Sequence, residues 1–230
     1  MKEFFQQTAF FGVFISLFSY GIGVFLRKKT KLSIFNPLLI AILLTMGALL
    51  LLDIDYEVYE GSAKYISYLL TPATVSLAIP LYEQIELLKK NWKAVFAGIF
   101  SGVLSSMVSV FLFALVFHLN HAEYVTFLPK SITTAIGMGV SEELGGHVAI
   151  TVAVIIITGI IGNIFAEIVC KLFKIKEPIA VGIAIGSSSH ALGTAKAMEI
   201  GDVEGAMSSL SIVVSGLLTV LGAMIFSNFI

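Results

Sequence analysis

The amino-acid sequence predicts an all-α membrane protein with about six full transmembrane helices and two broken or re-entrant segments. Apolar residues make up 57% of the 230 residues, charged residues make up only 13%, and the mean hydropathy is +0.98. Soluble domains carry about twice that share of charged residues. A membrane-spanning helix needs roughly 20 mostly apolar residues, and this chain has several runs of about that length. The chain is therefore predicted to lie in a lipid bilayer.

The rest of the composition excludes several classes of function. The single cysteine, Cys170, excludes an internal disulfide and a metal site built from cysteines. A net charge of −1 without a basic patch argues against nucleic-acid binding. The sequence has no nucleotide-binding loop, no nucleophile elbow and no metal-ligand spacing. We therefore expect no enzyme activity, no cofactor and no bound metal.

Six apolar segments are long enough to be complete spans. They cover residues 8–26, 35–52, 62–82, 93–117, 148–173 and 205–228. The first is followed by three basic residues and lacks a small-residue cleavage pattern, which is typical of a retained anchor rather than a signal peptide. Two further segments, Pro129–Gly146 and Pro178–Gly201, mix short apolar stretches with Ser, Gly and ionisable residues. Neither is an ordinary span, and we interpret residues 1–230 as one transmembrane domain.

The basic residues indicate how the helices are oriented. Ten of the 14 lie in three clusters, at residues 27–31, 89–93 and 171–176. Such clusters favour cytoplasmic loops. With these loops inside, the span 148–173 must begin outside, so Pro129–Gly146 has to enter from the outside and return there. Lys130 and Gly146 are then both expected on the outer side. Because irregular backbone at membrane depth is tolerated where it lines a wet cavity, this re-entrant segment is a candidate site.

The second irregular segment, Pro178–Gly201, leaves two alternatives open. If it re-enters from the inside, the C-terminus lies outside, and if it spans the membrane, the C-terminus lies inside. In either case its block of Ser and Thr residues is expected to approach the block in Pro129–Gly146 near the middle of the membrane.

An internal repeat is also predicted. A shift of 57 residues aligns Pro72–Ile79 with Pro129–Ile136, which share a Pro-x-[Thr/Ser]-[Val/Ile]-[Ser/Thr]-x-Ala-Ile pattern. The repeat-like units are residues 72–117 and 129–173, followed by a C-terminal broken helix and span at 178–228. The two units are expected to run in opposite directions, an arrangement typical of transporters that bind substrate at broken helices near the midplane. The first copy is expected to break at Thr71-Pro72, because proline disfavours helical geometry in the residue before it.

The first candidate site is the segment Pro129–Gly146. Pro129 suits the first turn of a half-helix, whose free N–H groups attract an anion, and Lys130 would add charge at the mouth. The candidate substrate-binding residues are the hydroxyl donors Ser131, Thr133 and Thr134. The alternative is that these hydroxyls bond to their own helix or join neighbouring helices. Gly145 and Gly146 permit the reversal that a re-entrant loop needs.

The second candidate site lies in Gly186–Lys196. Its candidate substrate-binding residues are Ser188, Ser189, His190, Gly193 and Thr194. His190 titrates near neutral pH and is a candidate to hold a carboxylate or pass a proton, although a lone histidine is more often structural. Glu142 and Glu143 are candidates for the same ion or proton path, because a carboxylate inside the membrane usually marks one. The alternative is that both acids are simply solvated in an outer vestibule.

Six motifs spread over nearly the whole chain carry a resemblance to a known family. They are Pro72–Thr74, Ala78–Tyr82, Leu128–Thr134, Glu143–Gly146, Ser189–Ala195 and Ser208–Leu210. Together they make the chain similar to the LrgB/CidB family of bacterial membrane proteins, which are described as antiholin-like or holin-associated. Pro72–Thr74 is closer to the LrgB branch, and Val140–Gly146 is closer to CidB-type members.

The resemblance implies two functions. Plastid relatives, which look like fused LrgA and LrgB halves, carry glycolate and glycerate, and some bacterial pairs are linked to pyruvate uptake. This implies a transporter of small 2-oxo- or 2-hydroxycarboxylates in the bacterial plasma membrane, with an LrgA-like small membrane protein as partner and with proton coupling left open. The alternative is an antiholin-like regulator of murein hydrolase export and cell lysis without a substrate. The hydroxyl-rich half-helix ends favour transport, and whether the chain forms a homo-oligomer is open.

Overall fold

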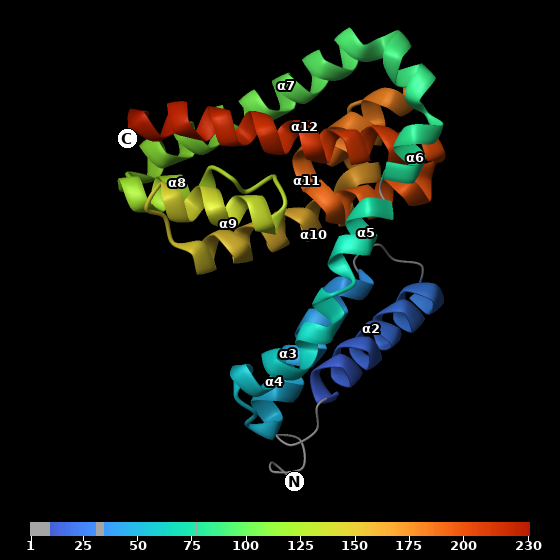
Figure 1. Cartoon of the computed structure of the whole chain (residues 1–230), viewed down its shortest axis with the longest axis vertical. Coiled ribbons are helices and arrows are strands. Elements are labelled where there is room, and N and C mark those ends of the chain that lie inside the picture. Colours follow the sequence, from blue (N-terminus) through green and yellow to red (C-terminus); the bar gives the residue numbers. More distant parts are fainter. Residues whose placement is uncertain (1–9, 31–34, 77) are drawn as a thin grey trace. The chain divides into compact units, whose positions relative to one another are not determined.

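The computed structural model describes residues 10–30, 35–76 and 78–230, and within these ranges every regular element is helical (Figure 1). Five helical stretches are long and apolar enough to span a membrane, which confirms the all-α membrane protein. Residues 8 and 9 of the first predicted span, Lys31 of the first basic cluster, and Leu77 lie outside the described residues. The contacts divide the chain into two compact units, Met1–Ser76 and Leu77–Ile230. Whether they act as one transmembrane domain stays a prediction.

The N-terminal unit is a small helical bundle. Its helices are α2 (Phe11–Thr30), α3 (Pro37–Leu52), α4 (Tyr56–Ser67) and α5 (Leu70–Ser76). Asn36 caps α3, because its Oδ1 accepts from the N–H groups of Leu38 at 2.9 Å and Leu39 at 3.2 Å. Helices α2 and α4 approach closely at Gly12, whose N–H donates to Ser62 Oγ at 2.8 Å.

The third predicted span, residues 62–82, is interrupted in a different place from the one expected. Helix α4 ends at Ser67 and α5 begins at Leu70, so the break lies at Tyr68-Leu69 and not at Thr71-Pro72. Pro72 is the third residue of α5. The first turn of a helix has free N–H groups, so proline is tolerated there and does not end the helix.

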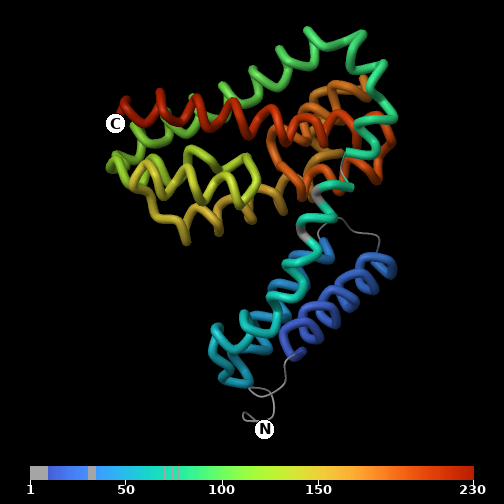
Figure 2. Tube along the Cα trace, viewed as in Figure 1, coloured from blue at the N-terminus to red at the C-terminus, as the bar shows by residue number. Residues whose placement is uncertain are grey.

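The C-terminal unit contains the long helices. Its elements are α6 (Ala78–Glu83), α7 (Ile85–Phe117), α8 (His121–Phe127), α9 (Thr134–Glu143), α10 (Val148–Leu172), α11 (Pro178–Ile200), α12 (Asp202–Phe226) and a 3₁₀ turn (Ser227–Phe229). Helices α7 and α12 pack against each other, and α11 packs against both α10 and α12 (Figures 1 and 2). The apolar core between α7, α8 and α12 is fully enclosed, for example at Ile99, Tyr124 and Met207.

This unit has two opposite ends. The basic end is where α7 begins and α10 ends, and it carries Lys89, Lys90, Lys93, Lys171, Lys174 and Lys176. The far end is where α7 ends and α10 begins. Helix α12 also ends there, because the carbonyl of Phe226 accepts from Tyr124 Oη at 3.1 Å and the carbonyl of Ile230 lies 2.7 Å from the ring of His121. Thus α7 and α10 run in opposite directions, as the proposed repeat requires.

Helices α8 and α9 form a re-entrant hairpin that starts and finishes at the far end. The ring of His121, at the start of α8, lies 3.3 Å from the carbonyl of Leu144, just after α9. Ser131, in the turn between the two helices, lies 3.2 Å from the Oγ of Ser106, which is about two thirds of the way along α7. The tip of the hairpin therefore lies about a third of the length of α7 from the far end.

Helix α8 begins at a capping box between Asn120 and Glu123. The position of Lys130 in this hairpin differs from the sequence expectation. Lys130 and Gly146 were expected together on the outer side. Instead Lys130 lies at the tip beside Ser131, whereas a Cβ at Gly146 would lie 3.0 Å from Thr126 Oγ1, back towards the far end.

Helix α11 is also a hairpin, folded back at His190. His190 has φ 43° and ψ −141°, which breaks the helical hydrogen-bond ladder. A Cβ at Gly193 would lie 3.0 Å from the side chain of Ile185, although residues eight apart in a continuous helix are separated by about 12 Å. The two limbs, before and after His190, both meet Ser208: Thr194 Oγ1 lies 2.7 Å from its Oγ, and a Cβ at Gly186 would lie 2.7 Å from its Cα. The α11 hairpin therefore starts and finishes at the basic end, which favours the re-entrant alternative that the sequence left open.

Candidate functional site

The two hairpin tips meet at a cavity of about 1150 Å³ in the C-terminal unit. Its walls come from α7, the tip of the α8–α9 hairpin, the second half of α10 and the first limb of α11. Nine of the residues that form these walls carry hydroxyl groups. They are Ser101, Ser105, Ser106, Ser109, Ser131, Thr158, Ser187, Ser188 and Ser189. Such a lining offers hydrogen-bonding groups to a small polar solute, although most of the exposed wall surface is apolar.

The structure brings part of the two sequence-predicted blocks together. Ser131 from the first block and Ser188 and Ser189 from the second line the same cavity. The shift of 57 residues that aligned the two prolines also places Ser131 over Ser188. Parts of the two blocks therefore line one cavity, whereas their approach at the middle of the membrane and the internal repeat stay predictions.

Lys130 stands beside these hydroxyls at the tip of the α8–α9 hairpin. Its Nζ donates to Ser131 Oγ at 3.0 Å, and Ser131 Oγ lies 3.2 Å from Ser106 Oγ. The half-helix behind the tip begins at Thr134, with Thr133 as its N-terminal cap residue, and not at Pro129 as expected. The reason is that the carbonyl of Pro129 accepts from the N–H of Ile132 in a turn, at 3.3 Å. The positive end of the α9 dipole thus lies close to Ser131.

The serines of the α11 hairpin form hydrogen bonds within their own helix and also line the cavity. Ser187 Oγ donates to the carbonyl of Ile183 at 2.7 Å, and Ser188 Oγ donates to that of Ala184 at 2.7 Å. Ser188 and Ser189 also lie 3.0 Å apart, oxygen to oxygen. All three residues line the cavity, and a serine hydroxyl that donates to a helix carbonyl can still accept a hydrogen bond from a ligand.

His190 does not line the cavity, in contrast to its predicted role. Its ring is buried against α10, where Nε2 lies 3.0 Å from the carbonyl of Ile155 and so donates to it. Thr194 is also buried, with Oγ1 donating to the carbonyl of His190 at 3.0 Å. Gly193 allows the two limbs of the hairpin to touch. These three residues therefore shape the tip of the α11 hairpin, and a role of His190 as proton carrier stays a prediction.

Other predicted residues lie away from the cavity wall. Thr133 and Thr134 are partly buried at the start of α9 but are outside the lining. Glu142 and Glu143 are both exposed at the end of α9, near the far end, which fits the solvated alternative for each. Gly145 follows them with φ +82°, the left-handed conformation that ends α9.

The serines of α7 were missed by the sequence interpretation. Ser101, Ser105 and Ser109 recur every four residues in an otherwise apolar span, so they lie on one face of α7, and all three line the cavity. A search of that span for polar residues at helical spacing would have found them.

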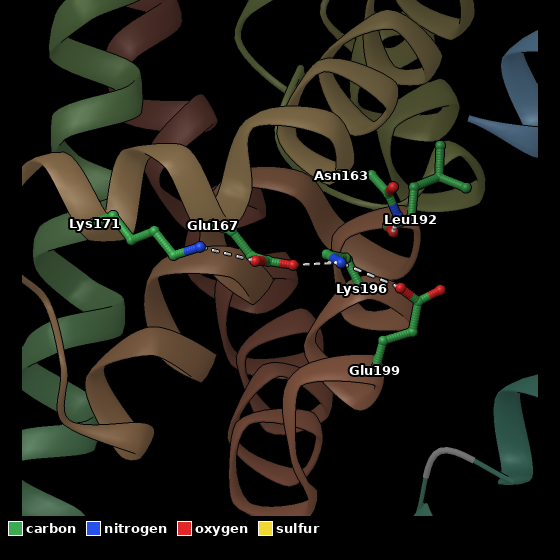
Figure 3. A network of polar contacts seen from close by, with 6 residues as sticks. All are labelled: Asn163, Glu167, Lys171, Leu192, Lys196 and Glu199. Carbon is green, nitrogen blue, oxygen red and sulfur yellow. Dashed lines mark hydrogen bonds and ion pairs between the residues drawn. The ribbon is translucent and has the colours of Figure 1, made fainter. Parts of the chain in front are cut away.

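A polar network ties the second limb of the α11 hairpin to α10 (Figure 3). Lys196 Nζ lies 2.6 Å from Glu167 and 3.2 Å from Glu199. Asn163 donates to the carbonyl of Leu192 at 2.7 Å, and Lys171 lies 3.4 Å from Glu167. Lys196 is thus neutralised by carboxylates. Within the described ranges, no group of His, Cys, Asp and Glu side chains is arranged to hold a metal ion.

Comparison with known proteins matches the chain to one family. The sequence model described as the LrgB-like family matches residues 16–229. The chain is 40% identical to a Bacillus subtilis (strain 168) protein named antiholin-like protein LrgB, over 97% of each chain. It is 39% identical to a protein of the same name from Bacillus cereus (strain B4264), over 97% of this chain and 98% of the relative. No solved structure matches the chain.

Proposed function

The chain belongs to the LrgB-like family, and we propose that it is a membrane carrier for small 2-oxo- or 2-hydroxycarboxylates, such as pyruvate or glycolate. The observation that carries this proposal is the cavity where two hairpins that enter from opposite ends present hydroxyl groups and one lysine. Broken segments that meet near the midplane are the usual place where carriers bind their substrate.

The size and chemistry of the cavity support a small organic anion. Its volume of about 1150 Å³ exceeds what a three-carbon acid needs, which leaves room for water around the solute. Serine hydroxyls can hydrogen-bond both a carboxylate and the neighbouring 2-oxo or 2-hydroxy oxygen. A wide lytic pore would require a much larger opening.

Orientation and partners follow from the family and from the charge pattern. The basic end is placed in the cytoplasm, because clustered lysines disfavour translocation, so the cavity faces the cytoplasm of a bacterial plasma membrane. An LrgA-like small membrane protein is the proposed partner. If transport is coupled to protons, His190, Glu142 and Glu143 are the candidate carriers.

The names of the relatives favour a second candidate function. Both Bacillus proteins are named antiholin-like, which describes a regulator rather than a carrier. In that case the chain would restrain a holin-like partner, regulate murein hydrolase export and cell lysis, and bind no substrate of its own.

Uptake into proteoliposomes separates the two functions. We expect saturable uptake of labelled pyruvate or glycolate, and we expect Ser105→Trp, which fills the cavity, to abolish it. Leu104→Trp is the matched control, because Leu104 is the adjacent, exposed residue of α7 outside the cavity wall. If no acid in a panel of small carboxylates is taken up faster than by empty liposomes, the antiholin-like regulatory function is favoured.

A further inference from the structure

The charge of Lys130 has no carboxylate partner among the residues that the structure describes. Lys130 is the one basic side chain among the described residues that line the cavity, and Glu177, at the basic end, is the one acidic side chain. No carboxylate in the described part of the chain forms an ion pair with Lys130. Its contact in the cavity is the hydroxyl of Ser131, at 3.0 Å.

A cation in this position is costly unless something neutralises it. Charged side chains at membrane depth normally pair with an opposite charge, because desolvation penalises an isolated one. Lys196 follows that rule, since two carboxylates lie within 3.2 Å of it. Lys130 departs from the rule and at the same time faces a cavity large enough for a ligand. The negative charge that would neutralise Lys130 is therefore best supplied by a bound solute.

We propose that Lys130, with Ser131 and Ser106, binds the carboxylate of a substrate that carries one negative charge. This rests on the proposed carrier function and specifies its substrate class as monocarboxylates. One lysine neutralises one carboxylate, and the remaining polar groups around it are hydroxyls, which leave a second carboxylate uncompensated. Glu177, towards the basic end of the cavity, would repel that second charge.

The test compares Lys130→Met with Lys196→Met. Binding of labelled pyruvate to the purified full-length protein is measured beside uptake into proteoliposomes, with malonate as the dicarboxylate competitor. Lys130→Met is expected to weaken pyruvate binding roughly 10- to 100-fold, the usual effect of losing a hydrogen bond to a charged group. Lys196→Met should bind pyruvate like the parent, and malonate should compete at least about tenfold more weakly than pyruvate, since its second charge stays unpaired.

Each result decides a different question. Unchanged binding by Lys130→Met, or equal competition by malonate, would overturn the monocarboxylate site even if the parent transports pyruvate. Binding that depends on Lys130 without any uptake would leave the site standing and remove the carrier function. Absence of pyruvate binding in the parent would overturn the site directly.

An independent observation concerns the far end, where the cavity is closed. On α7 its walls run from Asn91 to Ser109, and on α10 from Thr158 to Cys170, so among the described residues they stop several residues short of the far end of each helix. The region beyond them is filled by the α8–α9 hairpin, whose Val125, Leu128 and Ile132 are at most 1% exposed.

The closure of this region uses contacts that can separate. A cluster of hydroxyls joins the hairpin to α10: Thr151 Oγ1 lies 2.7 Å from Ser141 Oγ and 3.0 Å from the carbonyl of Thr126. Thr126 Oγ1 accepts from the N–H of His147 at 2.8 Å. We infer that the α8–α9 hairpin is the gate of the far end and that it carries Lys130 with it when it moves.

A disulfide across the gate tests this inference. Ser141→Cys with Thr151→Cys, in a Cys170→Ser background, should link α9 to α10 on oxidation. The linked protein is expected to lose uptake and to recover it with reductant, and either cysteine alone should have no such effect. A third cysteine at Ser105 should remain reactive to an impermeant thiol reagent applied at the basic end. Undiminished uptake by the linked protein would overturn the gate. If the parent shows no uptake, the gate is tested by the reaction of Ser105→Cys with the thiol reagent applied at the far end. A reaction that occurs in the reduced protein and is abolished by the disulfide supports the gate. If Ser105→Cys does not react from the far end in either the reduced or the oxidised protein, the gate is overturned.

Discussion

The two hairpins have similar shapes but are held in place by different forces. The α11 hairpin is packed by close backbone approach, since Gly159 and Gly162 of α10 receive His190 and Ser189 at its tip. Its second limb is also anchored by the ion pair between Lys196 and Glu167, at 2.6 Å. The α8–α9 hairpin also has one close glycine approach, of Gly137 to Ile155 of α10, but it is otherwise held by apolar contacts and hydroxyl groups, and its lysine has no carboxylate partner in the described chain. This difference suggests a fixed scaffold on one side of the site and a movable element on the other.

The largest expected effect is loss of stability when the tip of the α11 hairpin is pushed away from α10. A Cβ at Gly162 would overlap the side chain of Ser189, so Gly162→Ala should cost about 1–3 kcal/mol or more. Gly139→Ala is the control on the α8–α9 hairpin, because nothing lies within 4 Å of its Cβ position. It should be neutral or stabilise by roughly 0.5–1 kcal/mol, the usual helix preference for alanine. Thermal unfolding in detergent measures both, and equal effects would contradict the tight packing of α11.

The two lysines are expected to change stability in opposite directions. Lys130→Met removes an unpaired charge from the protein interior, so it should raise the melting temperature while it impairs binding. Lys196→Met leaves Glu167 with Lys171 alone and should cost about 0.5–1 kcal/mol, a small value because Glu167 is 42% exposed. Thermal unfolding in the same detergent tests the pair. Destabilisation by Lys130→Met would indicate that Lys130 has a structural partner and is no ligand site.

The pH dependence of uptake tests His190. Its Nε2 donates to the carbonyl of Ile155 and its ring lies outside the cavity wall, so we expect a structural role. His190→Gln keeps a donor of similar reach, and the pH profile of uptake near the ordinary histidine pKa of about 6.5 should match that of the parent. A flattened profile in well-folded His190→Gln protein would restore His190 as the proton carrier.

The smallest expected effect concerns single hydroxyls. Ser188→Ala removes one hydroxyl from the cavity wall and should weaken apparent affinity by about 1 kcal/mol, or roughly fivefold. Thr134→Ala is the matched control at the other hairpin, because Thr134 lies outside the wall, and it should leave the affinity unchanged. Concentration dependence of pyruvate uptake measures both values. If Thr134→Ala had the larger effect, the cavity wall would be assigned incorrectly.

Much of the fold could be predicted from apolar runs and charge. The helices α3, α7, α10 and α12 agree with predicted spans, because a hydrophobic stretch in lipid has few alternatives to a helix. The reversal at His190 could not be predicted, since a non-glycine residue with positive φ is uncommon and is held here by tertiary contacts with α10. The site was predicted in part. Ser131, Ser188 and Ser189 line the cavity, as predicted. Lys130 was predicted at the mouth of the site but lies at the tip of a hairpin, because the preference of basic residues for particular loops does not apply to the turn of a re-entrant hairpin.

Substrate protection of a cysteine inside the cavity tests the central claim most directly. In a Cys170→Ser background, Ser105→Cys places a thiol in the cavity wall, and Leu104→Cys places one on the neighbouring exposed face. Saturating pyruvate is expected to slow the reaction of Ser105→Cys with an impermeant thiol reagent at least about fivefold, because the bound acid excludes the reagent, and to leave Leu104→Cys unaffected. If both thiols reacted at the same rate with and without pyruvate, while pyruvate uptake was saturated, the substrate would bind elsewhere and the account of this cavity would be wrong.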